Sequence, residues 1–317
     1  MVGKVTDDCK ASGSIIPAIM GHSPYRTPNE TLKDVLDHLA GTANEWGGNE
    51  ATAWGNTLEP ILINEAARRL GVRDFNTEID YALKHPTLPL EVSLDCEAVG
   101  KGQRVRTDPS AGIFCMGSDE VQLNGPGAIE AKVTSRKPEE LPALGRGPLQ
   151  LQAQMMCGGY AWGALAILYR GTTMRVFIFE PHPATVKAIT DAVVDFDERL
   201  RSDPVRWYSV ENSADACLVY NQPDEEEPKV LEPAFTDAAK EFLLLKETIK
   251  DGQDALSQIG TEIQKEMGNH TLAIAGQYEI RWPMRRSKAT PEKIIPAKPA
   301  TEKRQTTIAI TAALPED

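Results

Sequence analysis

Two short stretches decide the fold of this chain: LEVSLDC at residues 90–96 and GAIEAKV at residues 127–133. Each is a run of apolar residues interrupted by charged ones, which is typical of a strand in a buried sheet. Successive side chains of a strand point to opposite faces, so Glu130 and Lys132 project from the same face. Asp95 ends the first run, and on a neighbouring strand it would bring a second carboxylate to that face.

A pocket of this kind is rich in hard oxygen ligands. Mg²⁺ prefers such ligands and is usually held by one or two carboxylates while it keeps several waters. Lys132 would orient the attacking water or offset charge that develops on a phosphate. The residues therefore indicate metal-dependent phosphodiester cleavage. A hairpin with solvated charges on its open face gives the same short pattern, and by itself that is the more common meaning.

Composition narrows the class of protein. The 317 residues are 41% hydrophobic and 25% charged, as in a globular protein. We see no apolar run long enough for a membrane span and no secretory signal. The five cysteines are scattered without metal-site spacing, which predicts reduced thiols in a cytosol. The net charge of −12 argues against non-specific nucleic-acid binding, but it allows a local basic channel inside an acidic exterior.

The order of predicted elements gives an α+β core over residues 1–210. It begins with a helix over residues 51–70, whose Glu59 either faces solvent or leans towards Asp95. Strands are predicted over 75–84, 90–99 and 128–134, with a polar insertion over 101–124 before the last of them. A helix over 149–158 follows, and then a hairpin of two strands over 162–170 and 174–180. The insertion is expected to extend the sheet as a hairpin.

The remainder of the chain differs in character. Residues 211–283 are predicted to form a helix pair, 234–252 and 254–267, that turns at Asp251 and Gly252, followed by a short strand. Residues 284–317 are polar and rich in proline, which predicts a weakly ordered tail.

Three glutamines alternate along the predicted helix over 149–158, namely Gln150, Gln152 and Gln154. Residues at i, i+2 and i+4 do not share one helix face, so at most two of them can have a common role.

Several short motifs occur in one order along residues 11–180. They are Gly13-Ser14-Ile15-Ile16, Gly21-x-Ser23-Pro24-Tyr25-x-Thr27-Pro28, Gly55-Asn56-x-Leu58-Glu59-Pro60, His85-Pro86, Ser93-x-Asp95, Glu130-x-Lys132 and Gln150-x-Gln152. In this order the chain resembles the YqaJ-like viral recombinases, the family of phage lambda exonuclease within the PD-(D/E)XK nuclease superfamily. None of the motifs is specific alone, but together they outweigh the solvated-hairpin interpretation.

The resemblance implies a restriction-endonuclease-like fold, a mixed central sheet flanked by helices with an αβββαβ core and here a C-terminal helical extension. It also implies a role for each matching residue. Asp95 and Glu130, with the carbonyl of Ala131, would bind the metal. Lys132 would be the catalytic lysine, and Glu59 and Gln152 would project into the site.

Further expectations come from the same resemblance. Ser14 and Ser93 match serines that hold the 5′-phosphate of the cut strand, and Lys10 could replace an arginine that serves there too. The motif departs from the family at two places, where Leu94 replaces a proline and Cys96 replaces a glycine. Neither side chain would bind the metal.

The implied function is a 5′→3′ exonuclease that requires Mg²⁺, with Mn²⁺ as a substitute, and digests linear double-stranded DNA. It would leave 3′ overhangs for a single-strand annealing recombinase. The resemblance further implies a homotrimeric ring, encoded by a phage or prophage and located in the bacterial cytoplasm. Two alternatives stay open: a Cas4-like or RecB-like nuclease of other polarity, and a non-catalytic protein that binds DNA ends.

Overall fold

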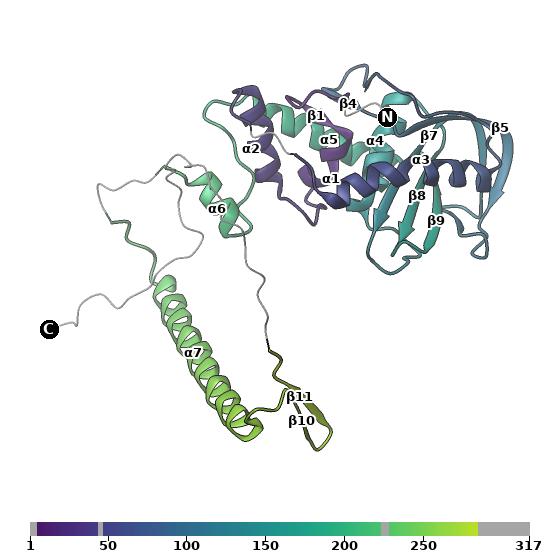
Figure 1. The fold of residues 1–317 in the computed structure, drawn as a ribbon. Coiled ribbons are helices and arrows are strands. Elements are labelled where there is room, and N and C mark those ends of the chain that lie inside the picture. The colour runs from purple at the N-terminus through teal and green to yellow at the C-terminus, as the bar shows by residue number, and fades with distance from the viewer. Residues whose placement is uncertain (1–4, 44–46, 223–227, 285–317) are drawn as a thin grey trace, which may run out of the picture. The chain divides into compact units, whose positions relative to one another are not determined.

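The structure is a computed structural model that describes residues 5–43, 47–222 and 228–284. The chain divides into two compact units, residues 1–219 and 220–317, and each is described here by itself. Figure 1 shows the sheet and most of the helices in the first unit and one long helix in the second. Among the described residues, no helix has both the length and the apolar character needed to cross a membrane.

A six-stranded mixed sheet forms the centre of the first unit, in the order β2-β5-β7-β8-β9-β6. The strands are β2 (Asp74–Asn76), β5 (Cys96–Arg106), β6 (Ile113–Cys115), β7 (Glu120–Thr134), β8 (Gly163–Tyr169) and β9 (Thr173–Phe179). Strand β7 pairs antiparallel with β5 and parallel with β8. The parallel pair requires a crossover, which the helix α4 (Pro148–Gly158) provides.

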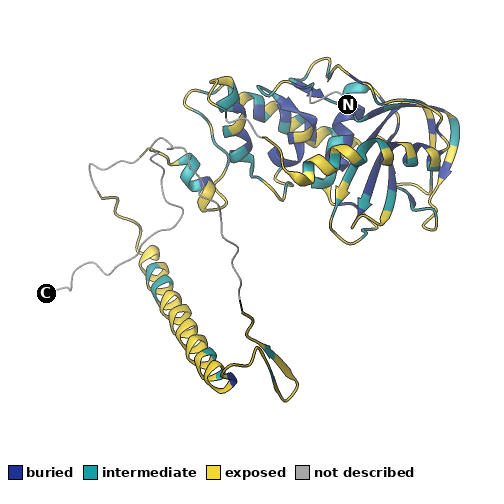
Figure 2. Ribbon diagram, viewed as in Figure 1, coloured by how far each residue is buried: buried dark blue, intermediate teal, exposed yellow. Residues whose placement is uncertain are grey.

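Both faces of the sheet are covered by apolar side chains. Strand β8 shows this clearly: Ala164 and Ala166 belong to the core that contains α3 (Glu50–Leu70), and Leu165 and Ile167 belong to the core that contains α4 and α5 (Pro183–Leu200). Figure 2 shows the resulting buried layer through the sheet. The order α3, β2, β5, β7, α4, β8 confirms the predicted αβββαβ, restriction-endonuclease-like core.

The strand before the candidate site is interrupted. The predicted strand over 90–99 is two strands, β4 (Leu90–Val92) and β5, separated by Ser93–Asp95. They separate because they pair with different partners: β4 lies between β1 (Ala11–Ser12) and β3 (Leu83–Lys84) in a small second sheet, whereas β5 joins the large sheet. The predicted strand over 75–84 likewise consists of β2 and β3. Asp95 therefore lies in an irregular segment, where its direction is not fixed by strand alternation.

The insertion over 101–124 extends the sheet as a hairpin, as expected. Strands β5 and β7 pair from Cys96–Ile129 at the base of the hairpin to Arg106–Glu120 near its tip. Residues 107–119 connect the two strands; they contain β6, which folds back to pair with β9, and an exposed bend at Gly117–Asp119. The base of this long hairpin carries the charged residues of interest, and the tip lies at its other end.

Two helices near the N-terminus pack against the sheet through α4 and α5. The short η1 (Gly13–Ile15) leads into α1 (Ile16–Ile19), and α2 (Pro28–Leu39) begins at a capping box between Thr27 and Glu30. A further 3-10 turn, η2 (Leu144–Arg146), precedes α4.

Helix α6 (Ser213–Val219) lies in the first unit, although the sequence predicted a boundary at residue 210. Its buried Asp215 accepts a hydrogen bond from Thr27 Oγ1 at 2.5 Å, which ties α6 to the start of α2. The contact explains why the compact unit continues to residue 219.

The second unit corrects one prediction. A single helix, α7 (Ala234–Met267), replaces the predicted pair, and Gly252 lies in its interior. An interior glycine costs about 1 kcal/mol relative to alanine, which weakens a helix without ending it. A hairpin of β10 (Leu272–Ala275) and β11 (Tyr278–Arg281) follows in place of one strand. The predicted tail lies, apart from Met284, outside the described residues.

Packing at the base of β7 yields a stability prediction. Trp162 is fully buried and donates from Nε1 to the carbonyl of Gly125 at 3.1 Å. A Cβ at Gly127 would lie 2.3 Å from the Trp162 ring. Gly127→Ala should therefore lower the free energy of unfolding by about 1–3 kcal/mol, measured by urea denaturation. The cost should shrink in a Trp162→Leu background, and an equal cost there would show that the ring is not the cause.

Candidate active site

Glu130 is the centre of the candidate site. It lies on β7 with no exposed surface, and both of its carboxylate oxygens have partners. Oε1 pairs with the ammonium of Lys132, two residues along the same strand. Oε2 accepts a hydrogen bond from Gln154 Nε2 of α4 at 2.6 Å. A buried carboxylate needs such partners, since an unpaired one would be strongly disfavoured.

Asp95 reaches the same strand from the break between β4 and β5. Its Oδ2 accepts a hydrogen bond from the backbone N–H of Ala131 at 2.9 Å. Ala131 lies between Glu130 and Lys132, so this bond fixes Asp95 beside both. The structure thus brings Asp95 beside Glu130 and Lys132, although the whole β5–β7 hairpin separates Asp95 from these two residues in sequence.

A cleft of about 350 Å³ opens over this group. One wall is the first half of α3, and the other is the end of β7 and the Asp95 segment; its lining includes Thr52, Asn56, Glu59, Asp95, Ala131 and Lys132. Glu59 is half-buried and faces this cleft, rather than standing on an open surface. The prediction that Glu59 leans towards Asp95 is the one that the geometry supports.

Burial and the charge of Glu130 raise the pKa of two neighbouring carboxyl groups, those of Glu59 and Asp95. Burial, and then the charge of Glu130, raise the pKa of Glu59. The same two causes raise the pKa of Asp95 well above its usual range. Burial lowers the pKa of Lys132, but the charges of Glu130 and Asp95 outweigh it and the net shift is upward. The site therefore concentrates negative charge that one ammonium only partly offsets.

This donor set suits a hard divalent cation. Within the described residues, no three His, Cys, Asp or Glu side chains are grouped closely enough to hold a metal by themselves. Two carboxylates, of Asp95 and Glu130, with the carbonyl of Ala131, match what Mg²⁺ uses when waters complete its shell. A cation there would also relieve the repulsion that raises the pKa of Asp95 and Glu59.

Gln152 does not join this group. Its Nε2 donates to the carbonyl of Glu180 at 2.9 Å, and its Oε1 accepts from the N–H of His182 at 3.0 Å. These bonds hold the segment before α5. The glutamine beside Glu130 is Gln154, which also donates to the carbonyl of Ser93 at 3.0 Å. The expectation that Gln152 projects into the site is thus corrected to Gln154, two residues further along α4.

The spacing of the glutamines predicts that Gln152 and Gln154 cannot both face Glu130. Gln152 and Gln154 lie about 200° apart around the helix, so one of them must face away from the sheet edge that carries Glu130. Sequence alone does not fix the rotation of α4. That rotation follows from Leu149, Leu151, Ala153 and Met155, all buried against the sheet and neighbouring helices.

The two glutamines offer a matched test. Gln154→Leu removes the donor to Glu130 and should lower the rate of DNA cleavage by about 10–100-fold, the usual cost of losing a group that orients a ligand. Gln152→Leu is the same change on the same helix and should leave the rate per folded molecule nearly unchanged. Rates are measured on linear duplex DNA, with folded fractions from circular dichroism. A larger loss in Gln152→Leu would reverse the assignment.

The two predicted phosphate-binding serines lie on neighbouring segments. Ser93 precedes Asp95 in the same break, and its carbonyl is held by Gln154. Ser14 is exposed in η1, with its hydroxyl 3.2 Å from that of Ser12. η1 packs against β4, where a Cβ on Gly13 would lie 2.9 Å from Val92.

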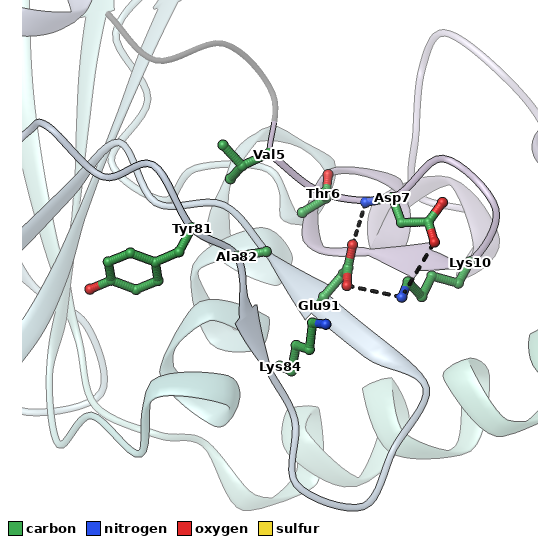
Figure 3. A pocket seen from close by; sticks show the side chains of 8 residues that line it. All are labelled: Val5, Thr6, Asp7, Lys10, Tyr81, Ala82, Lys84 and Glu91. Atoms are coloured by element: carbon green, nitrogen blue, oxygen red, sulfur yellow. Dashed lines mark hydrogen bonds and ion pairs between the residues drawn. The ribbon is translucent and has the colours of Figure 1, made fainter.

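Lys10 is engaged elsewhere. It pairs with Glu91 at 3.1 Å and with Asp7 at 3.4 Å. Figure 3 shows these residues in a pocket of about 490 Å³ that Lys84 and Tyr81 also line. Glu91 is buried, and its hydrogen bond with the ammonium of Lys10 is the main cause that raises the pKa of Lys10. A DNA phosphate would have to compete with two carboxylates for this ammonium, which weakens the proposed replacement of an arginine by Lys10.

Comparison with known proteins agrees with the sequence resemblance. Residues 8–161 match the family of the YqaJ-like viral recombinase domain. No curated protein matches the chain. Among solved structures, an alkaline exonuclease from Laribacter hongkongensis in complex with dAMP is 19% identical, with a TM-score of 0.43 over 62% of this chain and 89% of that one. A phage-related exonuclease from Haemophilus somnus is 12% identical, with a TM-score of 0.37 over 62% and 96%.

Proposed function

We propose that this chain, whose residues 8–161 match the YqaJ-like viral recombinase domain, digests one strand of linear double-stranded DNA from the 5′ end in a reaction that requires Mg²⁺. The match to this domain and the grouping of Asp95, Glu130 and Lys132 both support a DNA nuclease. The product would be a duplex with 3′ overhangs, the form of DNA that a single-strand annealing recombinase takes up.

One observation carries the proposal: Asp95, Glu130 and Lys132 converge at the base of one hairpin, and Glu59 faces the same cleft. Solvated surface charges would not be arranged in this way, since Glu130 has no exposed surface and is held by Lys132 and Gln154. Burying a carboxylate is costly, and the cost is understandable where the carboxylate serves a bound cation.

Each residue has a role in this proposal. Asp95, Glu130 and the carbonyl of Ala131 would hold Mg²⁺, or Mn²⁺ in its place. When bound, the cation supplies Lewis acidity towards the phosphate and lowers the pKa of a bound water. Lys132 offsets negative charge on the phosphate and orients the attacking water. Glu59 orients water from the α3 side of the cleft.

Ser14 and Ser93 are proposed to bind the 5′-phosphate of the strand that is cut. Both are hydroxyl donors on segments that meet beside the Asp95 break. A terminal phosphate held at a fixed distance from the carboxylates would place the first phosphodiester over the site, which favours cleavage from the 5′ end.

The assembly proposed for this activity is a homotrimeric ring around DNA, in the cytoplasm of a bacterial host that carries a phage or prophage. A ring reconciles DNA binding with the net charge of −12, because only its inner surface need be basic. Sedimentation of the protein at micromolar concentration tests the ring, and a strictly monomeric protein would remove it from the proposal.

The decisive experiment uses linear duplex DNA labelled at either the 5′ or the 3′ end, with Mg²⁺ or with EDTA. Early release of the 5′ label in Mg²⁺ alone is the expected result. Early release of the 3′ label would keep the nuclease and reject the polarity, in favour of a Cas4-like or RecB-like enzyme. No release in any divalent metal would favour a protein that only binds DNA ends.

The structure bears on the first of these alternatives. Many Cas4-like and RecB-like enzymes hold an iron–sulfur cluster on four cysteines, whereas all five cysteines of this chain lie in the described residues without forming a metal-binding group. A purified protein without absorbance near 400 nm would agree with this.

A further inference from the structure

Helix α7 carries a repeat that the proposed nuclease site does not use. Apolar residues recur at every seventh position along the whole helix, namely Phe235, Phe242, Ile249, Leu256 and Ile263. A second series, three residues further on, consists of Ala238, Leu245, Gly252, Ile259 and Glu266. Spacings of three and four that alternate over five heptads are the a and d positions of a coiled coil.

This seam is open to solvent. Phe235, Ile249, Leu256 and Ile259 are between 54% and 71% exposed, and Met267 is the buried residue of α7. Figure 2 shows exposed residues along most of the helix. Apolar residues that recur over five heptads of a 34-residue helix, several of them mostly exposed, mark an interaction surface rather than scattered surface hydrophobics.

We propose that α7 forms a parallel coiled coil with α7 of further copies of this chain. A seam with a 3.5-residue period faces its partner along its whole length only when the partner is a supercoiled helix with the same period. A second copy of α7 has that period because it has the same sequence. The proposal does not depend on the nuclease activity.

The charges beside the seam favour the parallel arrangement. In a parallel pair, position g of one helix faces the following position e of the other, which sets Glu241 against Lys246 of the second copy. In a fully overlapped antiparallel pair, position g faces position g, which sets Glu241 against Glu262 of the second copy. The other e and g positions are uncharged: Ala239, Thr248, Gln253, Ala255, Gly260 and Met267. The Glu241–Lys246 attraction in the parallel form and the Glu241–Glu262 repulsion in the antiparallel form favour the parallel arrangement, in which the two copies of Glu266 face each other at the last d position.

The first test is hydrogen exchange of α7 amides in the full-length protein over a range of concentrations. In the wild type, protection of residues 234–267 should rise with protein concentration. The variant Ile249→Lys/Leu256→Lys places two charges in the seam and should raise the concentration of half-maximal protection by at least about a hundredfold. Ser257→Lys/Gln264→Lys adds the same two charges, also seven residues apart, at outer b positions and should behave as wild type.

This local readout separates α7 from any contact made by the nuclease unit. Protection that is independent of concentration in both the wild type and Ile249→Lys/Leu256→Lys would mean that another part of the same chain covers the seam, and it would overturn the proposal. Equal loss in both lysine variants, or in neither, would overturn it too.

Three further variants test the register and the orientation. Gly252 occupies a d position with open space around its missing Cβ, so Gly252→Leu should lower the concentration of half-maximal protection several-fold. Glu241→Lys should raise it, and Glu241→Lys/Lys246→Glu should restore it. If Glu241→Lys instead strengthened association, the antiparallel form would be correct and the parallel one wrong.

Discussion

Asp95→Asn should reduce the rate of DNA cleavage by at least about a thousandfold at saturating Mg²⁺. The amide keeps the size of the carboxylate and can accept the hydrogen bond from Ala131, so the fold at the base of the hairpin is preserved. What is lost is one of the two carboxylates proposed to hold the cation, and about 4 kcal/mol of stabilisation of the reacting phosphate corresponds to a thousandfold change in rate.

The control for this variant is DNA binding, measured by fluorescence anisotropy in Ca²⁺ or without metal. Binding should remain within a few-fold of wild type or become tighter, because a negative charge facing the phosphates has been removed. Asp119→Asn, at the exposed tip of the same hairpin, should cleave at the wild-type rate. Normal cleavage by Asp95→Asn would show that the reaction takes place elsewhere in the molecule.

Lys132→Met should lower the cleavage rate by about a hundredfold to a thousandfold, the usual loss when a group that stabilises developing charge is removed. Methionine keeps the length and most of the apolar stem of lysine. The substitution leaves Glu130 without its cationic partner, so the protein should also bind metal differently and lose stability by several kcal/mol in the absence of Mg²⁺.

Stability measured with and without Mg²⁺ separates the two effects of Lys132→Met. If Lys132 acts on the phosphate, the cleavage rate stays low when Mg²⁺ has restored the folded state. A rate that recovers together with stability would give Lys132 a purely structural role. Lys101→Met is the matched control, since Lys101 is exposed on β5 and its pairing with Asp74 at 3.7 Å lies at the surface.

The sequence was sufficient to predict the core because its signals are local and agree with one another. The apolar runs, the hairpin of strands 162–170 and 174–180, and the crossover helix each follow from short-range signals, and their order defines the αβββαβ topology. Glu130 and Lys132 could be paired from strand alternation alone. The position of Asp95 beside them follows once its segment is known to enter the strand next to β7.

Two features could not be predicted from the sequence: the rotation of α4 about its axis and the break between β4 and β5. The choice between Gln152 and Gln154 depends on how α4 is turned on the sheet, which the packing of residues far away in sequence determines. The division between β4 and β5 depends on the pairing of β4 with β1, a contact across nearly 80 residues. The continuous helix α7 was not predicted because Asp251 and Gly252 were interpreted as a turn. One interior glycine lowers the stability of a long helix only slightly compared with what the residues on either side contribute.

The long β5–β7 hairpin carries the candidate site at its base and an exposed segment at its other end. Its base holds the proposed catalytic residues in fixed register, whereas Gly117–Asp119 near its other end is an exposed bend. Exposed turns of this kind are where a chain accepts extra residues most readily. The tip is therefore a ready attachment point: a short peptide tag or a fluorophore placed there would allow a single molecule to be followed along DNA without touching the residues that cut it.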